Sequence, residues 1–243
     1  MARNENLSLA AAPETVFHVW HHRQRIEIEA AGIFGRLADD LADLRGGDDE
    51  IVKLVRQSSE DELRHARYCQ DILSFSRKSF TPPPPNVSFD LGPAGLNRED
   101  RIIYTCVAAC CITETLSTAL LVDMYKKAAR GVIKETVYKI LADEVTHSRI
   151  GWAELARVSK TRNLNWVSSY VPQMIHAALV SDVGPVLNRT DAQADLSMWG
   201  ILSPFRAKEI MTEAMTTIIV PGLSRFGIEA RFDEKEMGEL RNA

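Results

Sequence analysis

The sequence predicts an all-α protein built on a bundle of four long helices. Apolar residues keep a helical period along most of the 243-residue chain. Glycines, prolines and helix-capping residues divide the first two thirds into two closely joined helix pairs. The pattern Asp-Glu-x-x-His occurs once in each pair, at 61–65 and 143–147, so the pairs resemble two copies of one helical hairpin. We expect a single domain, 1–243, with a four-helix core at 13–160.

The first predicted helix pair covers residues 13–44 and 50–79. Pro13 suits the first turn of a helix, and the apolar residues after it keep helical spacing. Gly46 and Gly47 end the first helix, and three acidic residues then suit the positively polarised start of the second. Because the connection is short, the two helices should be antiparallel neighbours.

The second predicted pair covers residues 97–130 and 131–160, with Asn97 as the N-cap. Residues 80–96 join the two pairs and include the four prolines 82–85, which cannot be helical. Fully extended, this connection would reach roughly 55 Å, whereas a 30-residue helix is roughly 45 Å long. The connection can therefore cross the bundle from end to end, which makes it the long crossover of a four-helix bundle.

Further helices are expected in residues 161–243, as accessory helices of the same domain. One covers about 164–181, with Pro172 as a kink or break. Another begins at a Ser203-Pro204 cap and runs to about residue 220, where Pro221-Gly222 should end it.

Composition and charge limit the classes of partner and the cellular compartment that we expect for this chain. A net charge of −4 and a pI near 5.9 give no basic surface, so no nucleic-acid partner is expected. The apolar run at 107–112 is too short to span a bilayer, and the N-terminus lacks the apolar core of a secretory signal. The four cysteines form no Cys-x-x-Cys pair. This pattern is typical of reduced thiols, and it excludes an iron site of the rubredoxin type. We expect a cytoplasmic protein with no membrane partner.

The repeated pattern predicts a metal site. The Glu and His of each repeat are three residues apart, so on a helix they leave the same face. In each pair the upstream helix adds one more glutamate. This order, Glu, Glu-x-x-His, Glu, Glu-x-x-His, is the complete ligand set of a two-metal carboxylate site in a four-helix bundle. The candidate ligands are Glu27, Glu62, His65, Glu114, Glu144 and His147.

Helical phase selects the two upstream glutamates. Glu27 and Glu29 lie about 200° apart around the helix, so only one can point inward. Glu27 shares its face with Trp20 and Phe34, whereas Glu29 shares its face with charged and polar residues, so Glu27 is the predicted ligand. Glu114 is the only acid in the apolar stretch 102–122, where an unpaired buried carboxylate would be costly.

The residue types indicate the metal. Oxygen-rich ligation with one imidazole per ion suits iron or manganese better than a thiolate-preferring metal. Asp61 and Asp143 each lie four residues before a candidate histidine. They can accept an imidazole N–H and fix the ring, either within their own hairpin or across the pseudo-twofold axis.

These residues resemble the ferritin-like di-iron carboxylate superfamily. Asp-Glu-Leu-Arg-His at 61–65 matches the signature of its oxygenase and ribonucleotide reductase branches, whereas the second copy has Thr146 in the Arg position. The first helix, with Glu27-Ile-Glu29-Ala30 followed by Phe34 and then Arg-Leu-Ala-Asp at 36–39, is similar to the first helix of aldehyde-deformylating oxygenases. The resemblance covers about residues 14–160. It implies a ferritin-like bundle in which Glu27 is a ligand.

The resemblance also implies an enzyme, a non-haem di-iron oxygenase or oxidase. Its cofactor would be two Fe ions, with Mn/Fe equally compatible, its co-substrate O2, and its electron donor an external ferredoxin or reductase. The substrate would be small or elongated and apolar, lying between helices near Glu27 and Glu114. Deformylation, hydroxylation, N-oxygenation and desaturation all fit this pattern, and so does a homodimer.

Three other readings stay open. Ferroxidase activity with iron handling, as in ferritins, and peroxide reduction, as in rubrerythrins, use related sites. Those families have a Tyr where this chain has Phe34, and ordinary ferritin lacks the second Glu-x-x-His. A non-enzymatic metal-binding protein is the third. Cys69, four residues after His65, is either a catalytic thiol or a small core residue, and the core role is favoured.

Overall fold

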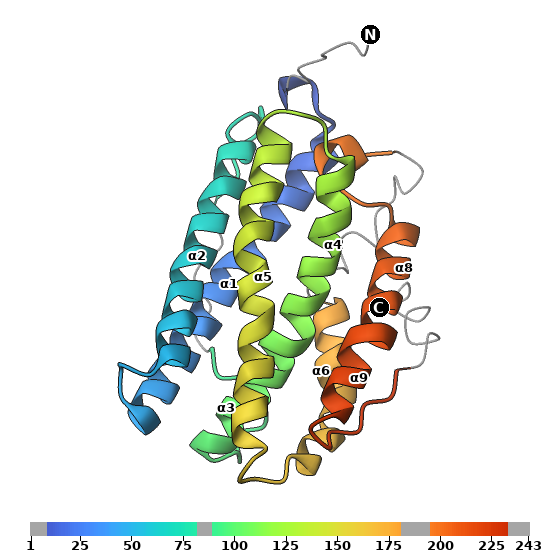
Figure 1. Cartoon of the computed structure of the whole chain (residues 1–243). Helices are drawn as coiled ribbons and strands as arrows, with labels where there is room; N and C mark the ends of the chain where they lie inside the picture. The colour runs from blue at the N-terminus through green and yellow to red at the C-terminus, as the bar shows by residue number, and fades with distance from the viewer. Residues whose placement is uncertain (1–8, 82–88, 181–194, 233–243) are drawn as a thin grey trace.

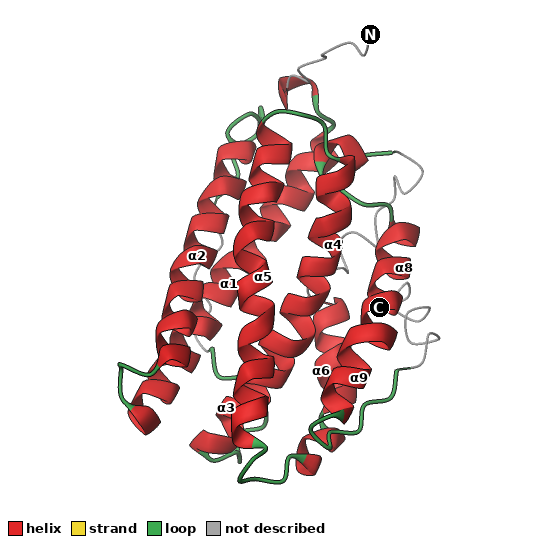
Figure 2. Ribbon diagram, in the orientation of Figure 1, coloured by secondary structure: helices red, strands yellow, loops and turns green. Residues whose placement is uncertain are grey.

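The computed structural model describes residues 9–81, 89–180 and 195–232, and within these ranges every regular element is a helix (Figures 1 and 2). The predicted all-α class is therefore confirmed. The four long helical segments run side by side, and the shorter C-terminal helices pack along one flank (Figure 1).

Helices α1 (Glu14–Arg45) and α2 (Glu50–Leu73) form the first antiparallel pair. Gly46 ends α1 with a φ of 87°, which a residue with a side chain rarely adopts. The Asp49 side chain then caps α2 by accepting a hydrogen bond from the backbone N–H of Ile51 at 2.9 Å. These features confirm the predicted boundary between the two helices.

The prediction that the second helix continues to residue 79 is wrong, because α2 ends at Leu73. The serines that follow use their hydroxyls on nearby backbone. Ser74 Oγ donates to the Asp71 carbonyl at 2.6 Å, and Ser76 Oγ accepts from the Lys78 N–H at 3.1 Å. Such local hydrogen bonds compete with helix continuation.

The second pair contains one long, interrupted helix and one regular helix. The first member consists of α3 (Arg98–Thr105), the π-helical segment η2 (Cys106–Thr113) and α4 (Glu114–Lys127). The second member is α5 (Val132–Val158). Helix α5 packs against both η2 and α4. The boundaries agree with the prediction, but the π segment was not predicted.

The connection between the pairs joins opposite ends of the bundle. Phe80, beyond the end of α2, contacts the rings of His18 and His21 near the start of α1. Arg98, at the start of α3, pairs with Asp43 near the end of α1, with Nη1 and Oδ2 3.0 Å apart. Figure 1 shows the same arrangement, with α2 ending at one end and α3 beginning at the other. The four prolines of the predicted crossover lie outside the described residues.

The C-terminal helices cover the α4 flank: α6 packs against η2, and α8 packs against α4. Arg206 of α8 donates two hydrogen bonds to Asp123 of α4, at 3.0 and 3.2 Å. The C-terminal elements are η3 (Asn165–Ser169), α6 (Val171–Ala178), η5 (Ser197–Trp199), α8 (Pro204–Ala214), η6 (Met215–Ile219) and α9 (Val220–Ser224), and a short η1 (Leu9–Ala11) precedes α1.

Of the two predicted proline breaks, one is confirmed and one is wrong. The helix predicted at 164–181 is interrupted at Tyr170, and Pro172 lies in the first turn of the new helix α6. Pro221 does not end its helix, because it lies in the first turn of α9, which continues to Ser224. A proline is tolerated there because its missing N–H would have no intrahelical partner. The preceding π segment η6 allows this new α-helical turn to begin at Val220.

One helical run, Arg98–Lys127, is long and apolar enough to cross a membrane by length and composition alone. In the bundle, 61% of its most apolar window is buried. A helix at the centre of a bundle core has the same composition, so this run is weak evidence for a membrane span.

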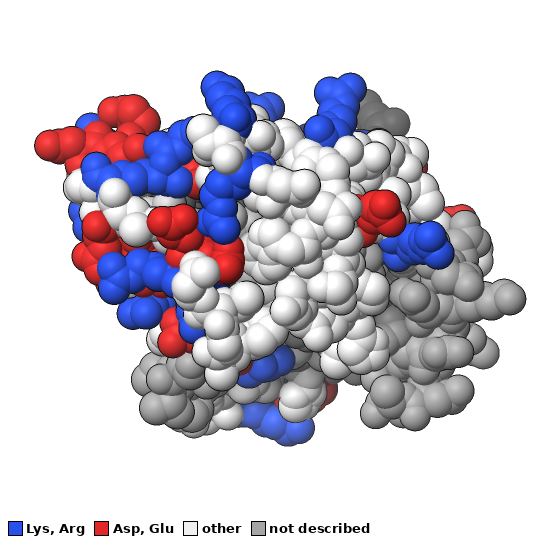
Figure 3. Space-filling view, turned by 90° about the horizontal axis from the view of Figure 1, so that it is seen from below, with Lys and Arg blue, Asp and Glu red and all other residues white. Residues whose placement is uncertain are grey.

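At the end of the bundle seen in Figure 3, acidic and basic side chains are interspersed beside a broad uncharged area.

Close packing between α5 and η2 depends on Gly151. A Cβ added to this glycine would lie 2.6 Å from the Cys106 carbonyl oxygen and 2.6 Å from the Cys111 sulfur. We therefore expect Gly151→Ala to lower the free energy of unfolding by about 1–3 kcal/mol, because overpacking must displace backbone. Urea denaturation measures the change.

Gly35→Ala is the matched control for this prediction. Gly35 also lies inside a helix, but its nearest contact to an added Cβ is the Ser59 hydroxyl at 3.4 Å. Alanine should be neutral or stabilising there, because it loses less conformational entropy than glycine on folding. Equal stability of Gly151→Ala and Gly35→Ala would contradict the close contact between α5 and η2.

Candidate metal centre

The six predicted ligands meet inside the four long helical segments, and all are buried. Their donor atoms form two groups, and within each group these atoms lie within 4.8 Å of one another. Such buried carboxylate and imidazole groups could hold metal ions. One group is Glu27, Glu62, His65 and Glu144, and the other is Glu62, Glu114, Glu144 and His147. Glu62 and Glu144 therefore belong to both groups.

The His65 ring presents Nδ1 to the carboxylates and Nε2 to the opposite hairpin. Its Nδ1 lies 3.3 Å from Glu62 Oε2 and 3.4 Å from Glu27 Oε2. Its Nε2 lies 3.0 Å from Asp143 Oδ2 on α5. If Nε2–H donates to this aspartate, the Nδ1 lone pair is free to face a cation.

The His147 ring repeats this arrangement from the other side. Its Nδ1 lies 2.8 Å from Glu62 Oε1 and 3.3 Å from Glu144 Oε2, and its Nε2 lies 3.4 Å from Asp61 Oδ2 on α2. Each aspartate thus contacts the histidine of the other hairpin. Of the two arrangements left open by the sequence, the structure shows the one across the axis.

Arg64 explains why the two repeats differ. Its Nη2 lies 2.7 Å from Asp61 Oδ1 and 2.8 Å from Asp143 Oδ2, so one guanidinium joins both aspartates. A second arginine at position 146 is not needed for this contact. Arg64 is part of the first Asp-Glu-x-x-His repeat, but the sequence did not indicate that its side chain would contact both hairpins.

The two upstream glutamates reach the cluster by different means. Glu27 is 3% exposed on the inner face of α1, whereas Glu29 is partly exposed and pairs with Arg25 at 2.9 Å, as helical phase predicted. Glu114 directly follows the π segment, in which Thr113 Oγ1 donates to the Ala108 carbonyl at 3.1 Å. The extra residue of a π turn redirects the side chains after it.

The electrostatics of the carboxylates fit a site for cations. Several carboxylates this close together in a buried site cannot all ionise. Burial, followed by the charges of Glu144 and Glu27, raises the pKa of Glu62 to about 8. Burial and the neighbouring Glu144 also raise the pKa of Glu114 well above its ordinary value.

The imidazoles act as the counter-ions of the metal-free cluster. Burial lowers the pKa of both rings, but hydrogen bonds to Glu27 and Glu62 raise the pKa of His65 to about 11. The adjacent Glu144 and Glu62 carboxylates likewise raise the pKa of His147 to about 10. Protons therefore occupy the positions that divalent cations would take.

Polar atoms without a well-oriented hydrogen bond point to the same conclusion. His147 Nδ1 lies 2.8 Å from Glu62 Oε1 and 3.3 Å from Glu144 Oε2, yet none of these three buried atoms makes a hydrogen bond of acceptable geometry. Buried polar atoms are normally satisfied, and exceptions often mark a position for an ion or water. These three atoms belong to the group of donors that contains Glu114, and Glu27 Oε1 in the other group shares the property.

Metal binding should release protons. At pH 7 the pKa values above leave both imidazoles and the Glu62 and Glu114 carboxyls largely protonated in the metal-free protein. Because ligands bind metal through deprotonated atoms, we expect loading to release roughly three to four protons per chain. Metal affinity should then rise with pH and fall as the pH is lowered.

This prediction can be checked with a pH indicator in weakly buffered, oxygen-free solution during Fe(II) addition. Glu29→Gln is the control and should release as many protons as the unaltered protein, because Glu29 belongs to neither donor group. Iron uptake without proton release would contradict the assignment of these groups as ligands.

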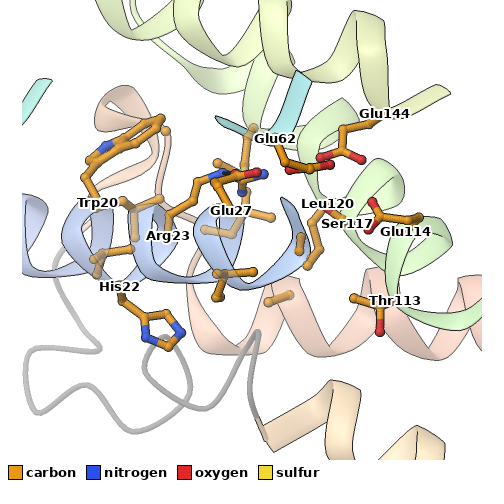
Figure 4. Close-up of a pocket in the computed structure, with 18 residues that line it drawn as sticks. Trp20, His22, Arg23, Glu27, Glu62, Thr113, Glu114, Ser117, Leu120 and Glu144 are labelled. Atoms are coloured by element: carbon orange, nitrogen blue, oxygen red, sulfur yellow. Dashed lines mark ion pairs between the residues drawn. The ribbon is translucent and has the colours of Figure 1, made fainter. Parts of the chain in front are cut away.

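An apolar cavity of about 110 Å³ lies beside the cluster, between α1 and α4. Figure 4 shows Glu27, Glu62, Glu114 and Glu144 at this cavity, with Trp20 toward one end and Thr113 toward the other. The cavity is also lined by Ile201 and Leu202, from the connection between η5 and α8, and by Ala207 of α8. A second cavity of about 190 Å³ shares Ile26, Ala30, Thr113 and Glu114 with the first.

Two further residues lie near the cluster. The sequence singled out Cys69 but not Arg23. Cys69 is fully buried, and burial followed by the charge of Glu27 raises the pKa of its thiol well above the ordinary value. It is therefore a neutral thiol packed in the core. Arg23 was not predicted, yet its Nε lies 2.8 Å from Glu27 Oε1. Its position four residues before Glu27 is the signal that could have found it.

Family models, curated proteins and solved structures were compared with this chain, and none matches. The structure itself establishes an all-α bundle whose buried carboxylate and imidazole groups could hold metal.

Proposed function

We propose that this protein is a ferritin-like di-iron carboxylate enzyme, an O2-dependent oxygenase or oxidase acting on an apolar organic substrate. The observation that carries the proposal is the pair of donor groups sharing Glu62 and Glu144, placed directly beside an apolar cavity. The resemblance of α1 and of the doubled Asp-Glu-x-x-His to that superfamily supports the same reading.

The donor set favours iron, with manganese as the alternative in one position. Each group offers three carboxylates and one imidazole, and no sulfur ligand. Hard and borderline divalent ions of the iron and manganese type prefer this set. Glu62 and Glu144 would serve both ions, while Glu27 with His65 and Glu114 with His147 would each serve one. When bound, the ion pair would supply the electrons that reduce O2, and an external donor protein would restore them.

The protein's own residues would orient the ligands and exclude water. Asp143 and Asp61 accept from the Nε2 atoms of His65 and His147, which fixes the rings with Nδ1 inward. The walls formed by Trp20, Leu120 and Ile201 would hold an apolar molecule against the Glu27 and Glu114 side of the cluster. Low water access beside the cluster favours reaction with the organic substrate.

The apolar cavity separates this proposal from iron storage and from peroxide reduction. Neither of those activities needs an apolar chamber beside the ions, whereas an organic substrate does. The C-terminal segments that line the two cavities, with Ala207 of α8 at the first and Met174 of α6 at the second, would serve as part of the substrate enclosure.

Single-turnover reaction of the Fe(II)-loaded protein with O2 tests this function. Medium-chain carboxylates, aldehydes, alkanes and aryl amines are added separately, and O2 uptake and organic product are measured together. We expect one class to yield oxidised product in proportion to the O2 consumed, and Glu144→Ala to yield none. Repeated Fe(II) oxidation that deposits a ferric mineral, with no organic product from any class, would instead indicate a ferroxidase.

A further inference from the structure

Arg23 places a cation in the wall of the apolar cavity. Its side chain comes from α1, and Figure 4 shows it between Trp20 and Glu27. It is the only Lys or Arg among the described residues that line this cavity. A guanidinium in an apolar chamber is costly unless an anion or several hydrogen-bond acceptors compensate it.

Direct contacts within the described part of the chain compensate Arg23 only in part. The one ion-pair partner of Arg23 there is Glu27, which is reached through Nε at 2.8 Å. No described residue accepts a hydrogen bond from the two terminal nitrogens. Because a guanidinium has five N–H donors in a planar fork, the face best suited to a carboxylate is left available.

Metal loading would not supply the missing compensation. Four glutamates carry a charge of −4 when ionised, and two divalent ions carry +4, so the loaded cluster is neutral overall. Glu27 would then share its charge with an ion, and Arg23 would keep an unbalanced positive charge beside the cavity. An anion entering the cavity would balance it.

Arg25 provides an internal comparison on the same helix. Arg25 and Glu29 form a pair with the same four-residue spacing, at 2.9 Å, and both side chains are about one third exposed. Solvent can compensate Arg25, so no ligand is needed there. The Arg23 side chain is 19% exposed and that of Glu27 is 4% exposed, so solvent compensates this pair far less.

We propose that the substrate of this cavity is an apolar molecule with a carboxylate head group, and that Arg23 binds the carboxylate. This inference rests on the proposed function, because it concerns the substrate of the same site. A carboxylate matches a single guanidinium fork, whereas phosphate sites commonly add a helix N-terminus or further cations. The apolar tail would extend along Ile26 and Leu120 toward the second cavity.

The alternative is that Arg23 only balances or positions Glu27. The two roles predict different losses when Arg23 is replaced. A residue that positions Glu27 would affect metal content, whereas a substrate anchor would affect the preference for an anionic ligand. Metal content and ligand preference must therefore be measured on the same samples.

Calorimetric titration of the Fe(II)-loaded, oxygen-free full-length protein with octanoate and with 1-octanol provides the test. We expect the unaltered protein to bind octanoate roughly ten- to a hundredfold more tightly than 1-octanol, because hydrogen bonds between charged groups are strong. Arg23→Gln should remove this preference while keeping the metal, and Arg23→Lys should keep part of it. Arg25→Gln should change neither quantity.

The outcomes separate this inference from the proposed function. If the protein takes up two ions but binds octanoate and 1-octanol equally, the carboxylate substrate is wrong and the metal centre stands. If Arg23→Gln keeps the preference, Arg23 does not bind the carboxylate and the anchor role is overturned, while the metal centre stands. Loss of metal in both Arg23→Gln and Arg23→Lys would assign Arg23 to Glu27 and overturn the anchor role. Failure of the unaltered protein to take up metal would overturn both proposals.

Discussion

Glu144→Ala should abolish binding of both metal ions, whereas Glu27→Ala should abolish binding of about one. Glu144 offers an oxygen to each of the two donor groups, and Glu27 belongs to one group only. Removing a shared carboxylate takes one of four donors from both positions, and the remaining neighbours lose the geometry that the pair of ions requires. Elemental analysis after anaerobic Fe(II) loading and desalting measures the effect.

The same experiment contains its own comparisons. Glu62→Ala should behave like Glu144→Ala, and Glu114→Ala like Glu27→Ala, because the groups are related by the pseudo-twofold repeat. Glu29→Ala, two residues from Glu27 on the same helix, should retain about two ions per chain. Retention of iron by Glu144→Ala at the level of the unaltered protein would show that the ions lie elsewhere.

Arg45→Leu should lower the free energy of unfolding by about 3–5 kcal/mol, because it leaves a buried carboxylate without its main partner. Arg45, at the end of α1, forms two hydrogen bonds with Glu154 of α5, one of them at 2.8 Å between Nη1 and Oε2. Glu154 is fully buried, and its other partner, Arg157, is 3.6 Å away. Denaturant unfolding of the metal-free protein isolates this effect from metal binding.

The double variant Arg45→Leu/Glu154→Leu distinguishes an unpaired charge from lost packing. Replacing both members of a buried pair by apolar residues is often neutral or stabilising, so the double variant should recover much of the loss. Arg25→Leu, which breaks a partly exposed pair, should cost less than about 1 kcal/mol. A double variant that is less stable than Arg45→Leu would contradict this explanation.

Helical periodicity was enough to predict the bundle and most of the site. A period of 3.6 residues places Glu62 beside His65, and it also separates the buried Glu27 from the exposed Glu29. These predictions succeed because they depend on positions within one helix. The orientation of Asp61 and Asp143 required the packing of α2 against α5, which the sequence left open between two arrangements.

Other features depend on interactions between residues far apart in the chain. Arg45 and Glu154 are 109 residues apart, and no local pattern links them. The π segment η2 consists of small and apolar residues, so its register leaves no trace in the hydrophobic pattern. The sequence does not distinguish Arg23 from the other charged residues of its helix. The structure shows that its guanidinium lies at an apolar cavity. The end of α2 was set by serine hydroxyls that helical periodicity does not register.

Anomalous diffraction at the iron edge from crystals of the Fe(II)-loaded protein would test the metal centre most directly. We predict two iron peaks inside the bundle, one beside His65 and one beside His147, with Glu62 and Glu144 contacting both. Iron bound instead at surface histidines such as His18 and His21, with none among the buried carboxylates, would contradict the assignment of this site as a two-metal centre.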